Sequence, residues 1–336
     1  MSVSDIGQLR TAPVPINWHD GLPIPASEQF LRAVGDDYGW IGGFDKAGEC
    51  RCILPYSIIS KLNCRIVRFR HETIPLGDEL EIEAERQFLD MAMEYFRSIH
   101  IDMVVPAGNT ALFRTYPSGA IAAPYGTYIK DLTLAEDELL AEMDAGCRKN
   151  IRRATRNAVE IRTGRDYLHL AYEMSKQTMA RTGAQLKSYG EIARLADALG
   201  EQVCIFVAFQ AGIIQACLVC VFSNHTAYTL YGGTAANPVQ GAMHLLHWAA
   251  MCQFKELGVK RFNFTGVRID PVPGTKQEGI LTFKARFGGQ LVRGYTWKHG
   301  LNRMKFAAYS FAVRLLHGGD VVDAEQGKLA GYQLAH

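Results

Sequence analysis

The sequence has no run of about 20 apolar residues, the length that a helix needs to span a bilayer. Its first ten residues lack the apolar stretch of a secretory signal peptide. Charged residues amount to only 21% and almost cancel, leaving a net charge of +2, whereas hydrophobic residues reach 48%. This composition excludes bulk disorder and supplies a full core. We therefore expect a soluble, cytoplasmic protein whose 336 residues form two domains.

Several catalytic signatures are also absent. The sequence contains no P-loop and no Gly-x-Ser-x-Gly elbow, which argues against an ATP site and against a serine nucleophile. His244 and His247 have helical spacing, but no glutamate accompanies them in a zinc-protease pattern, so we expect histidines of the helix surface or core. Cys217 and Cys220 lie in the apolar run 213–222, a predicted buried strand. Residues three apart on a strand point to opposite faces, so we expect core cysteines and no metal site.

The most informative stretch is 227–298. Residues 227–231 are β-branched and aromatic and predict a strand, which Gly232 and Gly233 end. A helix follows, with Asn237 as its expected N-cap, Pro238 in its first turn and Gly258 as its C-terminal stop. A buried strand over 259–264 comes next.

The N-terminal half predicts a similar plan. Residues 40–44 and 50–59 are expected to pair as antiparallel strands, followed by a strand over 65–69 and a helix over 79–98. That helix leads into a strand through residues 96–101, whose pattern matches residues 254–259 in the second half. The repetition fits a duplicated domain.

Charge is unevenly distributed along the chain. The charged residues within 72–142 are mostly acidic, and those within 255–305 are mostly basic. This division fits either a basic face for an anionic partner or two ordinary solvated surfaces. A predicted helix carries a basic stripe made of Arg148, Lys149, Arg152, Arg153 and Arg156. Like charges at this spacing destabilise a helix by a few tenths of a kcal/mol per pair, roughly, so phosphates of RNA or of a nucleotide sugar would explain the stripe. A solvated basic face remains the alternative.

The C-terminal half resembles a known family in a series of short motifs. These are Tyr231-Gly232-Gly233, the helix with Trp248, Leu257-Gly258, Phe264-Thr265-Gly266 and Phe283-Lys284-x-x-Phe287-Gly288-Gly289. They resemble the Fem family of aminoacyl-tRNA-dependent peptidyltransferases, which build cross-bridges on peptidoglycan precursors. The N-terminal half matches only in outline. The resemblance implies an α+β fold of two tandem GNAT-like domains, each a mixed twisted sheet flanked by helices, with boundaries at 1–144 and 145–300 and a C-terminal helix and tail over 301–336.

The same resemblance implies transfer of an amino acid from charged tRNA to an amine of a peptide, either a peptidoglycan precursor or a peptide natural product. The aminoacyl ester is already activated, so no cofactor is required. An acyl-CoA-dependent N-acyltransferase of a polysaccharide or cell-envelope pathway is the alternative, and a GNAT pair that only binds RNA or a carrier is a third. In CoA-dependent relatives, backbone amides of a glycine-rich loop before the helix hold the pyrophosphate. Here Gly241 is the only glycine after Gly233 in that loop, which argues against a normal CoA grip.

The resemblance also assigns residues to the site. It places Lys284, with Phe283 beside it, at the reaction centre, where a fixed cation would stabilise the oxyanion of acyl transfer. We expect the stretch around Lys284 to be a strand, and Asp102 is our candidate for the base. The substrate-binding candidates are Tyr231, Gly232, Gly233, Asn237, Arg268 and Arg286, and the candidates for tRNA phosphates are Arg148, Lys149, Arg152, Arg153 and Arg156.

A last amphipathic helix is expected over 301–317. Its apolar stripe comprises Met304, Ala307, Ala308, Phe311 and Leu315. Packing of that stripe on a domain is the usual outcome. The accompanying Arg303, Lys305 and Arg314 leave peripheral contact with a membrane as the second possibility.

Overall fold

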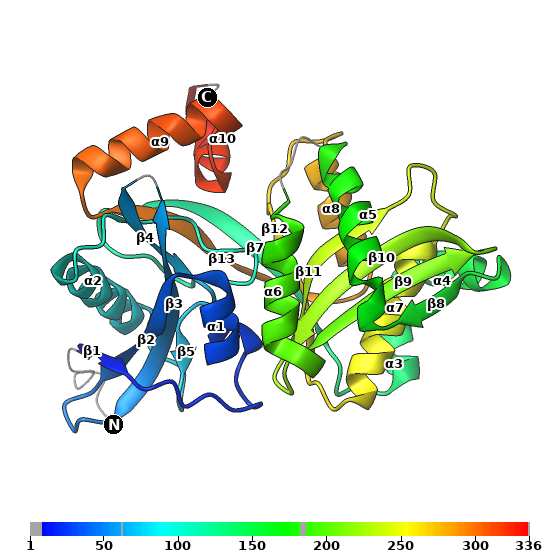
Figure 1. The fold of residues 1–336 in the computed structure, drawn as a ribbon, viewed down its shortest axis with the longest axis horizontal. Coiled ribbons are helices and arrows are strands. Elements are labelled where there is room, and N and C mark those ends of the chain that lie inside the picture. Colours follow the sequence, from blue (N-terminus) through cyan, green and yellow to red (C-terminus); the bar gives the residue numbers. More distant parts are fainter. Residues whose placement is uncertain (1–8, 62, 182–185, 335–336) are drawn as a thin grey trace. The chain divides into compact units, whose positions relative to one another are not determined.

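The computed structural model describes residues 9–61, 63–181 and 186–334. The chain divides into two compact units (Figure 1): unit 1 comprises Met1–Trp18, Pro25–Gly126 and Arg293–His336, and unit 2 comprises His19–Ile24 and Thr127–Val292. The sequence predicts domain boundaries at 144/145 and 300/301. The compact units change over within two strands, β7 (Ile121–Asp131) and β13 (Gln290–Gly300).

Unit 1 is built on a mixed sheet with strand order β1-β2-β3-β4-β6-β13-β7, and β5 pairs with β3. Its strands, besides β7 and β13, are β1 (Arg10–Val14), β2 (Asp37–Phe44), β3 (Cys50–Lys61), β4 (Cys64–Phe69), β5 (Ile74–Pro75) and β6 (Met103–Val104). Its helices are α1 (Glu28–Val34), α2 (Ile82–Ser98), α9 (Arg303–His317) and α10 (Val321–Leu334), with a 3-10 turn at Ile24–Ala26. The predicted pairing of the first two long strands is confirmed, with Ile41 opposite Leu54.

Unit 2 has the strand order β7-β12-β11-β10-β9-β8. The strands, besides β7, are β8 (Glu160–Thr163), β9 (Val203–Gln210), β10 (Ile213–Phe222), β11 (Ala227–Thr234) and β12 (Arg261–Val267). The helices are α3 (Glu136–Ala141), α4 (Ala145–Arg156), α5 (Leu168–Ala180), α6 (Tyr189–Leu199), α7 (Ala242–Glu256) and α8 (Lys276–Ala285), with 3-10 turns at Arg165–Tyr167 and Gly200–Gln202. Mixed sheets with helices packed on them confirm the predicted α+β class.

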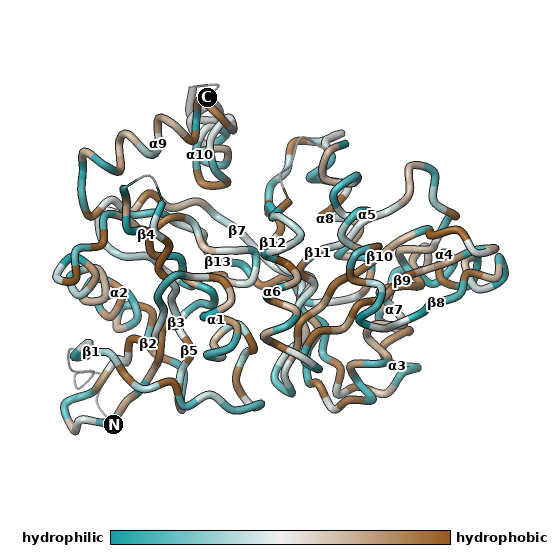
Figure 2. The backbone as a smooth tube through the Cα atoms, viewed as in Figure 1, coloured by the Kyte–Doolittle hydropathy of each residue, from teal (hydrophilic) through white to brown (hydrophobic). Residues whose placement is uncertain are grey.

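Residues of β10 alternate between the two faces of the unit 2 sheet. Leu218 and Cys220 pack in the cluster formed with α3, α4 and α7, whereas Cys217 and Val219 pack in the cluster formed with α5 and α6. The strand is hydrophobic along most of its length (Figure 2), and its side chains are buried on both faces because helices cover both of them. Cys217 and Cys220 are therefore core residues on opposite sides, as predicted.

The helix-to-strand exit that recurs in the sequence recurs in the structure. After α2, the amide of Ile101 donates to the carbonyl of Phe96 at 3.0 Å, and His100 has a left-handed φ of 60°. After α7, the amide of Val259 donates to Phe254 at 3.0 Å, and Gly258 has a φ of 79°. Both exits thus share one C-capping hydrogen-bond pattern, which confirms Gly258 as the stop of its helix and supports a duplication.

The C-terminal helix packs with a different face from the one that we expected. Phe306 and Tyr309 contact the cluster of Ile66, Met103 and Val105, while the predicted stripe, represented by Met304, Phe311 and Leu315, is exposed. The packing expectation for that stripe is wrong because two aromatic side chains on the other face fill the hydrophobic surface of the sheet. No helix in the described part of the chain is both long and apolar enough to cross a membrane.

Candidate active site

Two neighbouring parallel strands of unit 2 separate where the candidate site lies. β11 and β12 pair at Ala227–Phe262 and Tyr228–Asn263, yet β11 continues to Thr234 and β12 to Val267. Beyond these pairs the backbone groups on the facing edges are available to other partners. The split therefore offers a row of polar backbone atoms beside the apolar core of unit 2.

Thr265 carries an unusual backbone conformation at this split. Its φ is 60°, in the left-handed region that β-branched residues rarely adopt. A buried network holds it there: its amide donates to the Asn263 side chain at 2.7 Å, and its hydroxyl donates to the Thr229 carbonyl at 3.1 Å. Thr127 donates to the same Asn263 oxygen at 2.7 Å. Strain of roughly 1–3 kcal/mol that the surroundings enforce is a feature of functional sites.

Lys284 binds the backbone that this conformation presents. Its ammonium donates to the carbonyl of Thr265 at 2.9 Å and to that of Gly266 at 3.1 Å. The predicted strand around Lys284 is wrong, because the residue lies near the end of α8. The spacing of the aromatic residues explains the helix, because Phe283 and Phe287 are four apart and both reach the same aromatic cluster. This packing outweighs the strand propensity of the β-branched and aromatic residues in the segment.

An aromatic cluster that includes the adjacent Phe283 lies beside Lys284. Phe283 contacts the rings of His244 and His247 at 5.0 and 5.3 Å between centroids, and His247 stacks on Phe264 at 5.7 Å. Burial lowers the pKa of Lys284 to about 7, and burial also lowers the pKa of both histidines to about 4. The histidines are therefore neutral at pH 7, whereas Lys284 is poised between its two forms. His247 is a core histidine as expected, but its place beside the lysine was not foreseen.

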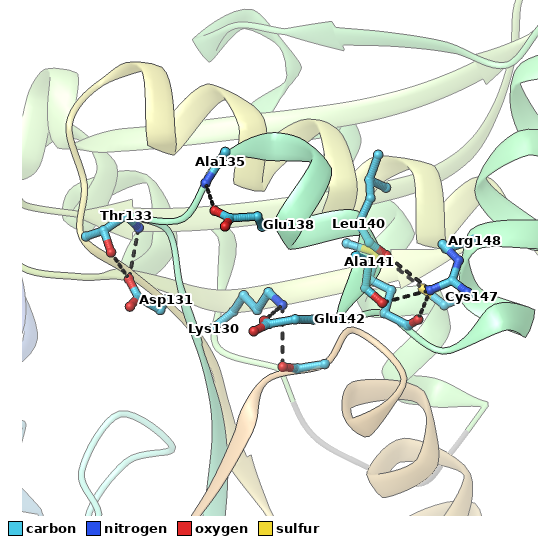
Figure 3. Close-up of polar contacts among 12 residues, drawn as sticks. Lys130, Asp131, Thr133, Ala135, Glu138, Leu140, Ala141, Glu142, Cys147 and Arg148 are labelled. Carbon is cyan, nitrogen blue, oxygen red and sulfur yellow. Dashed lines mark hydrogen bonds and ion pairs between the residues drawn. The ribbon is translucent and has the colours of Figure 1, made fainter.

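The glycine pair of the motif has a structural reason. Gly288 has a φ of 72°, and a Cβ there would collide with the Glu142 carbonyl. Figure 3 shows the buried Lys130 ammonium bridging the Glu142 carboxylate and a backbone carbonyl, which belongs to Gly288 at 3.4 Å. A Cβ at Gly289 would lie 3.0 Å from the carbonyl of Ile129. The turn thus seats the end of α8 on β7 and fixes Lys284.

The candidates on β11 are buried or half-buried, and the one that follows the strand is exposed. A Cβ on Gly233 would lie 2.8 Å from the backbone of Met174 in α5, so Gly233 serves close packing. Tyr231 and Gly232 lie on the same strand, half-buried. Asn237 does not cap the helix, because α7 starts only at Ala242 and its N-cap is Gly241. The predicted helix start is wrong by four residues, and Asn237 lies exposed in the preceding loop.

The start of α7 is closed by α4. Gly241 has a φ of 91°, and a Cβ on it would collide with the carbonyl of Asn150. The Arg153 guanidinium donates to the Gln240 side chain, and Gln240 donates to the Asn150 side chain at 3.5 Å. The amides that would face a pyrophosphate in a CoA-dependent relative therefore lie next to α4.

The basic helix contains residues of two kinds. Arg148 donates to the carbonyls of Leu140 and Ala141 at 3.3 and 3.0 Å and to Met143, so it caps the end of α3 (Figure 3). Arg153 is engaged with Gln240. By contrast, the side chains available at the surface belong to Lys149, Arg152 and Arg156, which are exposed and lie on one face at spacings of three and four. The structure thus narrows the five phosphate-binding candidates to these three.

The remaining candidates are engaged elsewhere or lie beside the split. Arg286 lies 3.9 Å from the Asp144 carboxylate, which caps α4. Arg268 follows β12 directly and is half-buried. In unit 1, the Asp102 carboxylate accepts from the Arg65 amide at 2.8 Å and from the Lys305 ammonium at 3.0 Å. These contacts tie α9 to the sheet and favour a structural role for Asp102 over that of a base.

Comparisons with known proteins agree with this architecture. Residues 145–277 match the family model described as an acetyltransferase (GNAT) domain. A search of curated proteins found no match. Among solved structures, FemX is similar with a TM-score of 0.65 at 14% identity, over 89% of this chain and 99% of that one.

Two further structures extend the likeness. The C-terminal domain of a putative lysylphosphatidylglycerol synthetase from Agrobacterium fabrum has a TM-score of 0.52 at 17% identity, over 87% of this chain and 93% of that one. A tandem GNAT protein from the clavulanic acid biosynthesis pathway has a TM-score of 0.50 at 12% identity, over 87% and 98%. At such identities the likeness is one of fold. Residues 145–277 are thus an acetyltransferase-type domain, and the chain as a whole has the α+β, tandem GNAT fold of the Fem-like proteins.

Proposed function

We propose that this protein is an aminoacyltransferase that moves an amino acid from aminoacyl-tRNA to an amine of a peptide. The acceptor is a peptidoglycan precursor or a peptide natural product. The observation that carries the proposal is Lys284, held by the Thr265 and Gly266 carbonyls at the split between β11 and β12. A lysine with a pKa of about 7 is suited to proton transfer in acyl transfer to an amine.

Lys284 has a role in both of its protonation states. The neutral amine keeps two N–H groups for the two carbonyls and presents its lone pair to the acceptor. It takes the proton that the acceptor nitrogen loses as the new C–N bond forms. The resulting ammonium then points its third N–H at the oxyanion of the tetrahedral intermediate. When the ester C–O bond breaks, Lys284 returns the proton to the ribose oxygen of the leaving tRNA.

The choice of donor rests on the start of α7 and on the basic helix. Asn150, Gln240 and Arg153 occupy the surroundings of Gly241, which disfavours a pyrophosphate at the start of that helix. The exposed cations Lys149, Arg152 and Arg156 form a row suited to the phosphates of an RNA strand. FemX and a putative lysylphosphatidylglycerol synthetase share the fold, and their names fit aminoacyl transfer.

The test is the mass of the product. The protein is incubated with a mixed pool of charged tRNAs and a set of peptide acceptors, and each acceptor is then weighed by mass spectrometry. We expect one acceptor to gain the mass of one amino acid residue. Mass gain only when acetyl-CoA replaces the charged tRNAs would overturn the proposal in favour of a CoA-dependent enzyme. No gain with either donor, together with retained RNA binding, would indicate a binding protein.

A further inference from the structure

The outer face of α9 presents large hydrophobic side chains to solvent. Met304 is 84% exposed, Phe311 69%, Leu315 75% and Leu316 71%. Met304, Phe311 and Leu315 follow one another at spacings of seven and four, so they form one stripe, and Ala307 lies exposed between them. Contiguous apolar surface of this kind marks an interaction site more often than scattered exposed residues do.

The helix is fixed with this face outward. On its inner side Phe306 and Tyr309 pack against the sheet of unit 1. Asn302 caps the first turn by accepting from the Lys305 amide at 3.2 Å, and Arg314 binds Asp323 of α10 at 2.7 Å near the other end. Turning the stripe inward would break all of these contacts. The exposed face is therefore a stable property of the unit.

The charged residues of α9 itself are all basic, and two of them are paired with acidic residues of neighbouring elements, Arg314 with Asp323 and Lys305 with Asp102. Arg303, Lys305 and Arg314 lie on α9, and the helix contains no acidic residue. The Lys305 ammonium donates to the carbonyl of Asn63 at 2.9 Å, which places the turn after β3, with the exposed Lys61, beside the start of the helix. An apolar stripe bordered by cations matches an anionic lipid surface, in which acyl chains lie below phosphates.

We propose that α9 docks on an anionic lipid bilayer, with Met304, Phe311 and Leu315 inserted at the boundary of headgroups and acyl chains. Arg303 and Lys61 then lie at the level of the lipid phosphates. A second copy of the chain is the less suitable occupant, because face-to-face pairing of α9 with itself would bring like charges together. The proposal does not depend on the identity of the acyl donor.

Co-sedimentation with vesicles tests the proposal. Parent protein is mixed with vesicles of phosphatidylcholine alone or with one third phosphatidylglycerol, and the bound fraction is measured at low and high salt. We expect binding to the anionic vesicles that weakens with salt. The double change Phe311→Ser and Leu315→Ser should lower the partition coefficient at least tenfold, and Arg303→Glu should lower it severalfold. The matched control is Ile213→Ser, an equally exposed apolar residue of unit 2, which should bind like the parent.

Three results would overturn the proposal. The parent could fail to bind either vesicle, or the double variant could bind as well as the parent. Alternatively, light scattering could show a dimer of the parent that the double variant dissolves, in which case the face is an interface between copies. Both serines replace exposed side chains, so we expect the double variant to fold, and circular dichroism checks this. If the double variant does not fold, the Arg303→Glu variant alone tests the proposal.

Discussion

Replacement of Lys284 separates its two proposed roles. Lys284→Met removes both the base and the cation, while Lys284→Arg keeps a cation that cannot lose its proton in the working pH range. An ordinary lysine with a pKa of 10.5 is only ~0.03% neutral at pH 7, whereas one with a pKa of about 7 is roughly half neutral. Burial therefore raises the neutral fraction by about three orders of magnitude, and this gain is what both variants lose.

We expect kcat to fall roughly 10²–10³-fold in Lys284→Met, because one preorganised group at the transition state contributes that much. Lys284→Arg should fall nearly as far, since a permanent cation cannot accept the proton of the acceptor amine. Affinities for tRNA and acceptor should change little, because the role belongs to the transition state. Single-turnover kinetics with charged tRNA and equilibrium binding of each substrate measure the two effects separately.

The pH profile gives a second signature. In the parent, the ionisation of Lys284 should contribute about a tenfold rise in kcat between pH 6 and pH 8, with a bend near pH 7, where its amine becomes neutral. An acceptor amine with a pKa near ~10.4 adds a slope of its own, but no bend at neutral pH. The bend should vanish in both variants. A parental kcat in Lys284→Arg with an unchanged profile would refute proton transfer, and a parental kcat in Lys284→Met would remove Lys284 from the mechanism.

Four further outcomes follow from the same structure. The triple change of Lys149, Arg152 and Arg156 to Gln should reduce the salt dependence of tRNA binding by an amount that corresponds to at most about three phosphate contacts. The control Arg148→Gln removes the cap of α3, so it should lower the free energy of unfolding and leave the salt dependence unchanged. Titration calorimetry should detect no acetyl-CoA binding tighter than millimolar, and micromolar binding would contradict our view of the α7 start. Gly288→Ala should lower the free energy of unfolding, measured in urea, by on the order of 3 kcal/mol, because the new Cβ would collide with Glu142. The control Gly274→Ala has a similar φ of 76° but open space around it, and it should lower the free energy of unfolding by only about 1 kcal/mol. Equal losses would show that the turn at Gly288 is not tightly packed. Because the pKa of Lys284 is depressed in the folded state, the unfolded chain binds more protons between pH 7 and pH 10.5, so parental stability rises across that window. The difference in unfolding free energy between the parent and Lys284→Met should therefore shift by about 3.5 kcal/mol in favour of the parent from pH 7 to pH 10, and a constant difference would mean an ordinary lysine pKa.

Elements with a strong local signal were predictable from the sequence. Paired strands on both sides of the turn at residues 45–48, the core positions of Cys217 and Cys220 and the stop of α7 at Gly258 all follow from period and turn chemistry. The repeated exit pattern at 96–101 and 254–259 even pointed to the duplication, because one hydrogen-bond arrangement accepts both His100 and Gly258 at its left-handed position.

Other features depend on contacts distant in sequence. The helix around Lys284 forms because Phe283 and Phe287 share an aromatic cluster with His244 and His247, and no local propensity encodes that cluster. Asn237 has the chemistry of an N-cap, but the α4 backbone beside Gly241 sets where α7 begins. The split of β11 from β12 and the conformation of Thr265 also depend on tertiary contacts. Their signal in the sequence was the Phe264-Thr265-Gly266 motif, whose role becomes clear only with Lys284 in place.

The central claim is the identity of the donor, and one competition experiment tests it most directly. Parent protein is incubated with one peptide acceptor and two competing donors, which are tRNA charged with a ¹⁵N-labelled amino acid and ¹³C-labelled acetyl-CoA. The Lys284→Met variant serves as the control. Our account predicts that the acceptor gains the ¹⁵N-labelled residue, that ribonuclease treatment of the tRNA abolishes the gain, and that the variant forms the product at least a hundredfold more slowly. An acceptor that carries the ¹³C-labelled acetyl group instead, with ribonuclease having no effect, would contradict it.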